Sequence, residues 1–275
     1  AKIQVVPYFA LHNRSSLPIG TYIFSDLERT TVQQRSFLSA IYSELQVGLD
    51  PAKLINHPAD SARRYGLLHD LHERGLNSFK AYCAKDFSEE WNYPVFLRTE
   101  NRHEGNLSPL INEPKILRQS VESLVKQGLD RENLLIVEFC DTQDADGLYR
   151  KYSSFRVGDV ILPRHVLFSR RWMLKDMDIL EPEHRIEIRT YCATNPHERQ
   201  LMEIFELANI QYGRIDYALL DGKIQVWEIN TNPLIVKPPA QYPGFSIPFH
   251  TRFAFRFGAA LANLDRAGLI KENPQ

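Results

Sequence analysis

Residues 214–233 constrain the fold more than any other stretch of the chain. They contain two apolar-rich runs on either side of Asp221 and Gly222, a dipeptide typical of the tight turn of a β-hairpin. Pro233 has no N–H to donate to a neighbouring strand, so the second strand is expected to end close to it. The sequence therefore predicts two antiparallel strands joined by a short turn.

Four polar side chains interrupt these apolar strands, namely Arg214, Asp216, Glu228 and Asn230. Because successive side chains alternate between the two faces of a strand, the length of the turn decides which of them meet. A two-residue turn would put Asp216 and Glu228 on opposite faces, whereas a three-residue loop with a left-handed Gly222 puts all four on one face. We therefore expect a three-residue loop, with Arg214 opposite Glu228.

Two carboxylates and an amide oxygen beside an arginine form a suitable site for a hard cation. Mg²⁺ takes oxygen ligands, usually a few protein carboxylates together with substrate phosphates. The alternative is a solvated hairpin face with a surface ion pair, since charged runs usually face solvent. The hairpin taken alone leaves both interpretations open.

The pattern Arg-x-Asp, a hairpin and then Glu-x-Asn-x-Asn-Pro resembles the closing motif of the ATP-grasp superfamily, which includes D-alanine–D-alanine ligase, glutathione synthetase and biotin carboxylase. The resemblance implies that Asp216, Glu228 and Asn230 hold Mg²⁺ ions that bridge the phosphates of ATP. It also implies that Arg214 is catalytic and stabilises the acyl-phosphate and the tetrahedral intermediate.

The same resemblance assigns candidate ATP-binding residues upstream. Arg98 ends an expected strand at the position where the family carries a phosphate-binding lysine. Arginine keeps the positive charge and suits phosphate, but its planar fork differs in geometry from a lysine. Glu138, Phe139 and Cys140 correspond to the hinge that lines the adenine pocket, and Asp141 corresponds to the carboxylate that binds the ribose hydroxyls.

Further basic residues are weaker candidates for phosphate or substrate contacts. Arg150, Lys151 and Arg164 lie in the next expected hairpin, where the resemblance implies cationic side chains. For each of them the alternative is an ordinary exposed cation, because most Lys and Arg side chains face solvent. A second family lysine, expected near residues 63–65, has no counterpart in the sequence.

The expected fold class is α/β in the α+β sense: an ATP-grasp fold with two α+β lobes that clasp ATP, preceded by a shortened α/β N-terminal domain. The expected domains are residues 1–80, 81–140 and 141–275. Hydrophobic periodicity and turn residues predict strands at 3–9, 21–24, 53–55, 93–100, 134–139, 148–156 and 160–168, and helices at 35–45, 61–74, 112–126, 197–210 and 253–264.

Composition narrows the class of protein further. The net charge of −1 gives no reason to expect nucleic-acid binding, and no apolar run reaches the length of a membrane span. The three cysteines, Cys83, Cys140 and Cys192, are widely spaced and odd in number, which indicates reduced thiols and a cytoplasmic protein.

The expected function is an ATP- and Mg²⁺-dependent ligase that joins a small-molecule carboxylate to an amine or similar nucleophile through an acyl-phosphate. One alternative is a non-catalytic or regulatory nucleotide-binding protein with the same fold, which the missing lysines favour. The set of four polar residues favours an enzyme, because buried carboxylates without a cation are costly. A further alternative is an ATP-grasp kinase. The sequence gives no indication of the oligomeric state.

Overall fold

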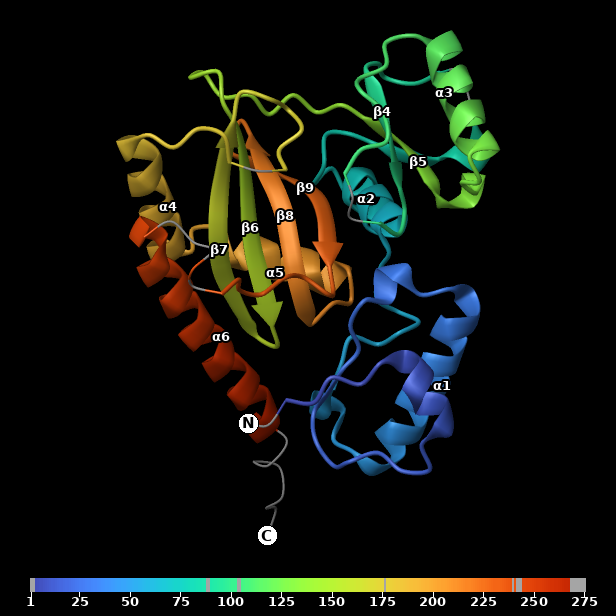
Figure 1. Cartoon of the computed structure of the whole chain (residues 1–275), viewed down its shortest axis with the longest axis vertical. Helices are drawn as coiled ribbons and strands as arrows, with labels where there is room; N and C mark the ends of the chain where they lie inside the picture. The colour runs from blue at the N-terminus through green and yellow to red at the C-terminus, as the bar shows by residue number, and fades with distance from the viewer. Residues whose placement is uncertain are drawn as a thin grey trace.

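The computed structural model describes residues 3–87, 90–102, 105–175, 177–238, 240 and 244–267. They form a mixed α+β arrangement that contains a two-stranded, a three-stranded and a four-stranded sheet (Figure 1). The strands are β1 (Tyr22–Ile23), β2 (Leu54–Ile55), β3 (Ala81–Cys83), β4 (Val95–Thr99), β5 (Leu134–Glu138), β6 (Tyr149–Val157), β7 (Val160–Ser169), β8 (Tyr212–Leu220) and β9 (Lys223–Asn230). The helices are α1 (Val32–Gly48), α2 (Arg64–Glu73), α3 (Pro114–Lys126), α4 (Pro182–Thr194), α5 (Glu198–Leu207) and α6 (Ile247–Ala267).

The N-terminal part is a small α/β unit. Strands β1 and β2 pair in parallel, and α1 begins with a capping box in which Thr31 and Gln34 satisfy each other's backbone N–H groups. The expected strand at 3–9 was wrong, because residues 3–7 have no regular structure and a 3₁₀ helix spans Tyr8–Asn13. Ile3 and Val5 are exposed, so the apolar character of this segment does not reflect burial in a sheet.

The three-stranded sheet has the order β3-β5-β4 and is antiparallel. One face packs against α3, whose first turn contains Pro114, a residue suited to that position. The other face carries Phe96 and Val137, which pack with Leu68 of α2. Because Arg98 lies two residues after Phe96 on β4, its side chain leaves the sheet on this second face.

The four-stranded sheet has the order β7-β6-β8-β9 and is covered on both faces. Helices α4 and α5 bury one face through a core that includes Tyr191 and Phe205, while α6 packs Phe253 and Phe257 against the other. Helix α4 was not expected from the sequence. Among the described residues, none of the helices has both the length and the apolar character that a membrane span requires.

The hairpin of β8 and β9 differs from the expected one in its turn and in its pairing, although its four polar residues still share one face. The expected pairing of Arg214 with Glu228 was wrong, because Arg214 pairs with Asn230. The three-residue loop was wrong: Leu220 pairs with Lys223, and both turn residues have positive φ. That geometry is the two-residue turn typical of hairpins. A β-bulge with Trp227 as the additional residue then shifts the register, so that Asp216 faces Glu228 directly.

The turn gives a stability prediction with an internal control. Gly222 has φ of +75°, so a Gly222→Ala variant is expected to lose about 1–2 kcal/mol of the free energy of unfolding. Gly66 lies in α2 with no neighbouring atom within 4 Å of an added Cβ, so Gly66→Ala is expected to be neutral or slightly stabilising. Urea unfolding of the two variants measures the difference, and equal stabilities would contradict it.

Candidate functional site

The hairpin brings its four polar residues to one face of the sheet. Asp216 pairs with Glu228 and Arg214 pairs with Asn230, and directly paired residues lie on the same side. The outer edge of β9 is held at the bulge by Asn77, whose amide accepts from Val226 N at 2.9 Å and donates to Val226 O at 3.0 Å. The shared face therefore depends on a contact from the segment between α2 and β3.

Asp216 lies in a basic environment. The guanidinium of Arg214 donates to both of its carboxylate oxygens, at 2.9 and 3.2 Å, and the Ser153 hydroxyl donates at 2.7 Å. Lys151 Nζ lies 3.8 Å from the second oxygen and donates to Leu174 O at 3.1 Å. Of the three predicted cations of the β6–β7 hairpin, Lys151 is therefore the one beside the predicted metal ligands.

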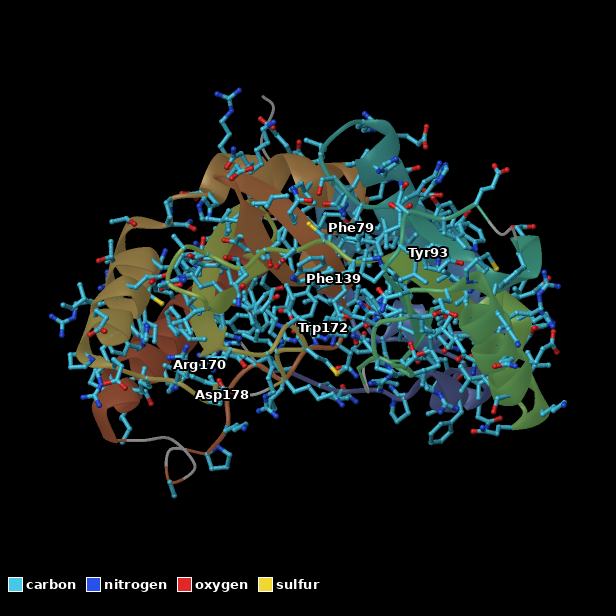
Figure 2. All side chains as sticks on the ribbon, turned by 90° about the horizontal axis from the view of Figure 1, so that it is seen from above. Phe79, Tyr93, Phe139, Arg170, Trp172 and Asp178 are labelled. Atoms are coloured by element: carbon cyan, nitrogen blue, oxygen red, sulfur yellow. The ribbon has the colours of Figure 1, made fainter. Side chains whose placement is uncertain are left out.

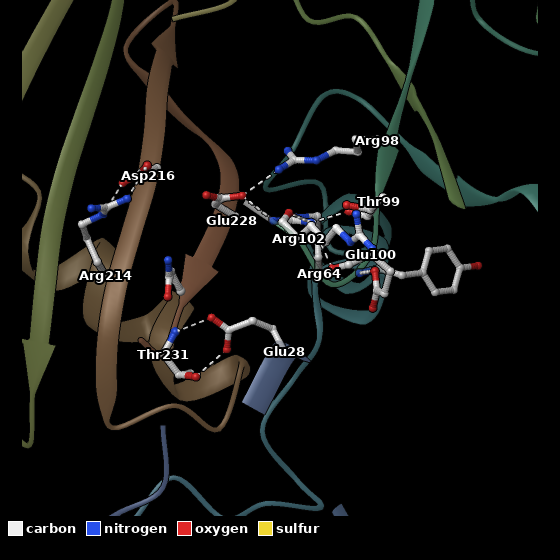
Figure 3. Close-up of polar contacts among 12 residues, drawn as sticks. Glu28, Arg64, Arg98, Thr99, Glu100, Arg102, Arg214, Asp216, Glu228 and Thr231 are labelled. Carbon is white, nitrogen blue, oxygen red and sulfur yellow. Dashed lines mark hydrogen bonds and ion pairs between the residues drawn. The ribbon is translucent and has the colours of Figure 1, made fainter. Parts of the chain in front are cut away.

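Glu228 binds two arginines that come from different elements. Arg64 at the start of α2 and Arg98 on β4 each donate to Glu228 Oε2 at 2.6 Å (Figure 3). The side chains of Arg64, Arg98 and Glu228 are 4%, 11% and 13% exposed, so this is a buried ionic cluster. Burial lowers the pKa of Arg98 to about 10, the Arg64 charge acts in the same direction, and Glu228 opposes both.

Arg64 also fixes the start of the loop that follows β4. Its guanidinium donates to the carbonyl oxygens of Thr99, Glu100 and Arg102, and the Tyr65 N–H donates to the Glu100 carboxylate at 2.9 Å (Figure 3). Reasoning from the sequence did not assign a role to Arg64, although residues 63–65 are where the family resemblance implies a lysine. The feature of the sequence that could have identified Arg64 is its positive charge, which matches that of the lysine expected there.

The end of β9 is held by the N-terminal part of the chain. Glu28 accepts from both Thr231 N and Thr231 Oγ1, and Thr231 Oγ1 in turn accepts from Leu27 N at 3.0 Å (Figure 3). Asn230 Oδ1 accepts from Asn232 N at 2.7 Å, which orients the amide. The motif at residues 228–233 is therefore anchored from a segment about 200 residues earlier in the sequence.

The predicted adenine-binding hinge lies between the three-stranded and the four-stranded sheets. The Glu138 carboxylate is buried and accepts from Lys80 N and from Tyr82 OH, both at 2.9 Å. The carboxylate therefore stabilises the start of β3 through these two hydrogen bonds. Phe139 meets the edge of Trp172 with ring centroids 5.5 Å apart (Figure 2).

Cys140 and Trp172 belong to the apolar cluster that joins the two sheets, with Phe96 and Trp227 among its members. Trp172 lies 5.2 Å from Phe96 between ring centroids, so the loop after β7 reaches the small sheet. Cys140 Sγ lies 3.3 Å from the Ser78 hydroxyl, and burial raises the pKa of its thiol. The cysteine is thus a small buried side chain of this cluster.

The remaining predicted ligands lie apart from this face. Arg150 projects from the opposite face of β6 and binds the carboxylates of Asp144, Asp146 and Glu187. These ion pairs neutralise the charge of Arg150 with two carboxylates of the loop before β6 and one carboxylate of α4.

Arg164 is buried beneath α6, where it donates to Ile235 O at 3.1 Å and contacts His250 Nδ1 at 2.6 Å. Asp141 is exposed and accepts from Gln143 N at 3.1 Å. Burial, together with a hydrogen bond to Asp141, raises the pKa of Tyr149 to about 12. The structure therefore does not bring Arg150, Arg164 and the hairpin quartet into one cluster.

The donor set was tested against the groups that the family resemblance implies. Two carboxylates and an amide oxygen on one face fit Mg²⁺ chemically. Within the described ranges, no group of three or more His, Cys, Asp and Glu side chains converges as a metal site, so the third protein oxygen would be that of Asn230. Arg98 Nε is buried without a hydrogen-bond partner among the described residues, which fits a phosphate oxygen.

Comparisons with known proteins bear on the fold. Neither a family model nor a curated protein sequence matches the chain. A D-alanine–D-alanine ligase from Bacillus anthracis matches over 98% of this chain and 85% of its own, with 11% identity and a TM-score of 0.53. The same enzyme complexed with ATP matches over 85% and 74%, with 10% identity and a TM-score of 0.49.

An L-amino acid ligase from Bacillus licheniformis matches 64% of this chain at 14% identity and a TM-score of 0.40, and the chain spans only 41% of that protein. At these identities the similarity concerns the fold. The match over nearly the whole chain, together with the order of the sheets and the hairpin motif, agrees with the expected fold class. The chain has the ATP-grasp fold.

Proposed function

We propose that the protein is an ATP- and Mg²⁺-dependent ligase that joins a small-molecule carboxylate to an amine or similar nucleophile. The observation that carries this proposal is that Arg214, Asp216, Glu228 and Asn230 lie on one face of the hairpin. Arg98 of the three-stranded sheet donates to the carboxylate of Glu228. The ATP-grasp fold supports it, since residues from both sheets would then surround the nucleotide. Residues 81–140 and 141–275 would form the two lobes.

Each residue has a role that follows from its chemistry. Mg²⁺ held by Asp216, Glu228 and Asn230 would neutralise β- and γ-phosphate oxygens. Arg98 would donate its free Nε–H to a phosphate, where a fork of donors suits the anion. Arg214 would donate to the oxygen on which negative charge develops when the nucleophile attacks the acyl-phosphate.

A specific observation favours a second candidate, a nucleotide-binding protein without ligase activity. Both carboxylates of the quartet are already neutralised by arginines, Asp216 by Arg214 and Glu228 by Arg64 and Arg98. A metal ion would have to compete with these ion pairs. The two candidates therefore differ in whether nucleotide binding depends on Mg²⁺ and whether ATP is turned over.

Product analysis separates the candidates. Incubation with Mg·ATP and mixtures of amino acids is expected to release ADP and phosphate and to form a new amide, detected by mass spectrometry. ADP with a phosphorylated acceptor and no free phosphate would instead indicate a kinase. Binding of ATP without any ADP would support the non-catalytic candidate and contradict the ligase.

Arg98 offers a test of the nucleotide site itself. An Arg98→Gln variant removes a charged donor from the phosphates, so the Kd for ATP is expected to rise about tenfold to a hundredfold. Arg199→Gln is the matched control, because Arg199 is exposed on α5 and, within the described part of the chain, forms an ion pair with Glu203 of its own helix alone. Calorimetric titration measures both, and an unchanged Kd in Arg98→Gln would exclude the phosphate contact.

A further inference from the structure

A second basic site lies at the other edge of the four-stranded sheet. A cavity of about 50 Å³ lies between α4, α6 and the edge strand β7. Four arginines contribute to its lining, Arg164, Arg189, Arg252 and Arg256, together with the thiol of Cys192. None of the described residues that line it is acidic. The cavity therefore concentrates positive charge in one small space.

The sequence produces this concentration through helix and strand geometry. Arg189 and Cys192 are three residues apart on α4, and Arg252 and Arg256 are four apart on α6, spacings that place each pair on one face of its helix. Arg164 is the additional residue of a bulge in β7, because Ser153 pairs with His165 while Ser154 pairs with Pro163.

Three of the arginines, Arg189, Arg252 and Arg256, carry charge that no described carboxylate compensates. Arg164 is buried, and it donates to Ile235 O and contacts the ring of His250. Like charges gathered in this way repel one another, and an anion from solution would relieve that repulsion.

We propose that this cavity binds a phosphate-type dianion, either inorganic phosphate or the terminal phosphoryl group of a small molecule. A cavity needs about 10–15 Å³ to hold one water molecule, so a cavity of about 50 Å³ has room for a larger group. Planar guanidinium groups match the oxygens of phosphate in geometry. Four positive charges also favour a doubly charged phosphate over a carboxylate, which carries a single negative charge.

This site is separate from the proposed ATP site and does not rest on it. Glu228 lies on β9, and β7 is the strand at the opposite edge of the same sheet. Arg214 and Asp216 lie on β8 and Lys151 lies on β6, and the described lining of the cavity includes none of these residues. An occupant of the cavity would contact β7, α4 and α6, the elements that carry that lining.

The thiol of Cys192 gives a readout that is local to the cavity. Cys192 is half-buried, whereas Cys83 and Cys140 are buried, so alkylation by N-ethylmaleimide at each cysteine can be followed separately by peptide mass spectrometry. Inorganic phosphate is expected to slow labelling of Cys192 with a saturating dependence, about tenfold at ten times the Kd. Acetate and chloride at the same ionic strength are expected to protect much less.

Variants decide whether the arginines are responsible. In Arg252→Gln/Arg256→Gln the protection ratio with and without phosphate is expected to fall close to one, and in Arg199→Gln it is expected to stay at the unmodified value. Both replaced side chains point to the cavity or to solvent, so the double variant should keep its fold, which thermal melting checks. Arg189→Gln is a second variant that removes a single charge. Equal protection by acetate, or full protection in the double variant, would overturn the proposal. Repeating the phosphate arm with a phosphorylated metabolite distinguishes the two sources of the anion.

Discussion

An Asp216→Asn variant is expected to lose Mg·ATP-dependent turnover by about a thousandfold or more, because several kcal/mol of charge stabilisation would disappear with the metal ligand. Asp216 is 6% exposed and accepts hydrogen bonds from Arg214 and Ser153. Asparagine has nearly the same shape and keeps one acceptor oxygen, so the fold should persist. The measurement is the rate of ADP release with saturating Mg·ATP.

Glu203→Gln is the control for this result. Glu203 is 60% exposed on α5, and Arg199 of the same helix is its one ion-pair partner among the described residues, so its loss should leave turnover unchanged. An Asp216→Asn enzyme that keeps its melting temperature and most of its activity would remove Asp216 from the metal site. Equal losses in both variants would point to a general effect of removing negative charge.

A Glu228→Gln variant is expected to lose about 3–5 kcal/mol of the free energy of unfolding as well as its activity. The carboxylate of Glu228 is the shared partner of Arg64 and Arg98, all three of which are mostly buried. Glu228→Gln removes the one carboxylate that both arginines are shown to bind, and breaking a buried ion pair by removing one partner is the costly case. Guanidinium unfolding measures this loss.

Two further variants identify the cause of that loss. Glu122→Gln breaks the exposed pair between Glu122 and Arg131 and is expected to cost about 0–1 kcal/mol. Glu228→Gln/Arg98→Gln removes one of the two buried cations and is expected to recover part of the stability. A Glu228→Gln variant as stable as Glu122→Gln would mean that water already compensates the arginines.

Local pattern predicted much of the secondary structure. The strand at 134–139, the hairpin at 148–168 and the helix at 112–126 all appear with nearly the expected bounds, because apolar periodicity there coincides with burial. Helix α4 was missed, since its sequence between Pro182 and Thr194 carries few apolar residues in a clear stripe. The strand at 3–9 was wrong because apolar residues alone do not supply a neighbouring strand.

The hairpin illustrates how a correct site can follow from a wrong register. The shared face of Asp216 and Glu228 was predicted through a three-residue loop, but the protein uses a two-residue turn and inserts Trp227 as a bulge. Nothing in the run of residues around Trp227 marks a bulge. The side chain of Asn77, which binds both backbone groups of Val226, holds it in place from about 150 residues away.

For residues 214–233, the sequence by itself determined that two strands form, where the turn lies and which polar residue types the strands carry. These features depend on local backbone preferences and on alternation along a strand. Only the tertiary structure decided that Arg64 and Arg98 share Glu228, that Arg150 faces away from the site, and that four arginines line one cavity. Those pairings join segments far apart in the chain. Their energies depend on burial and on distances of a few ångströms, which are set when the sheets and helices pack.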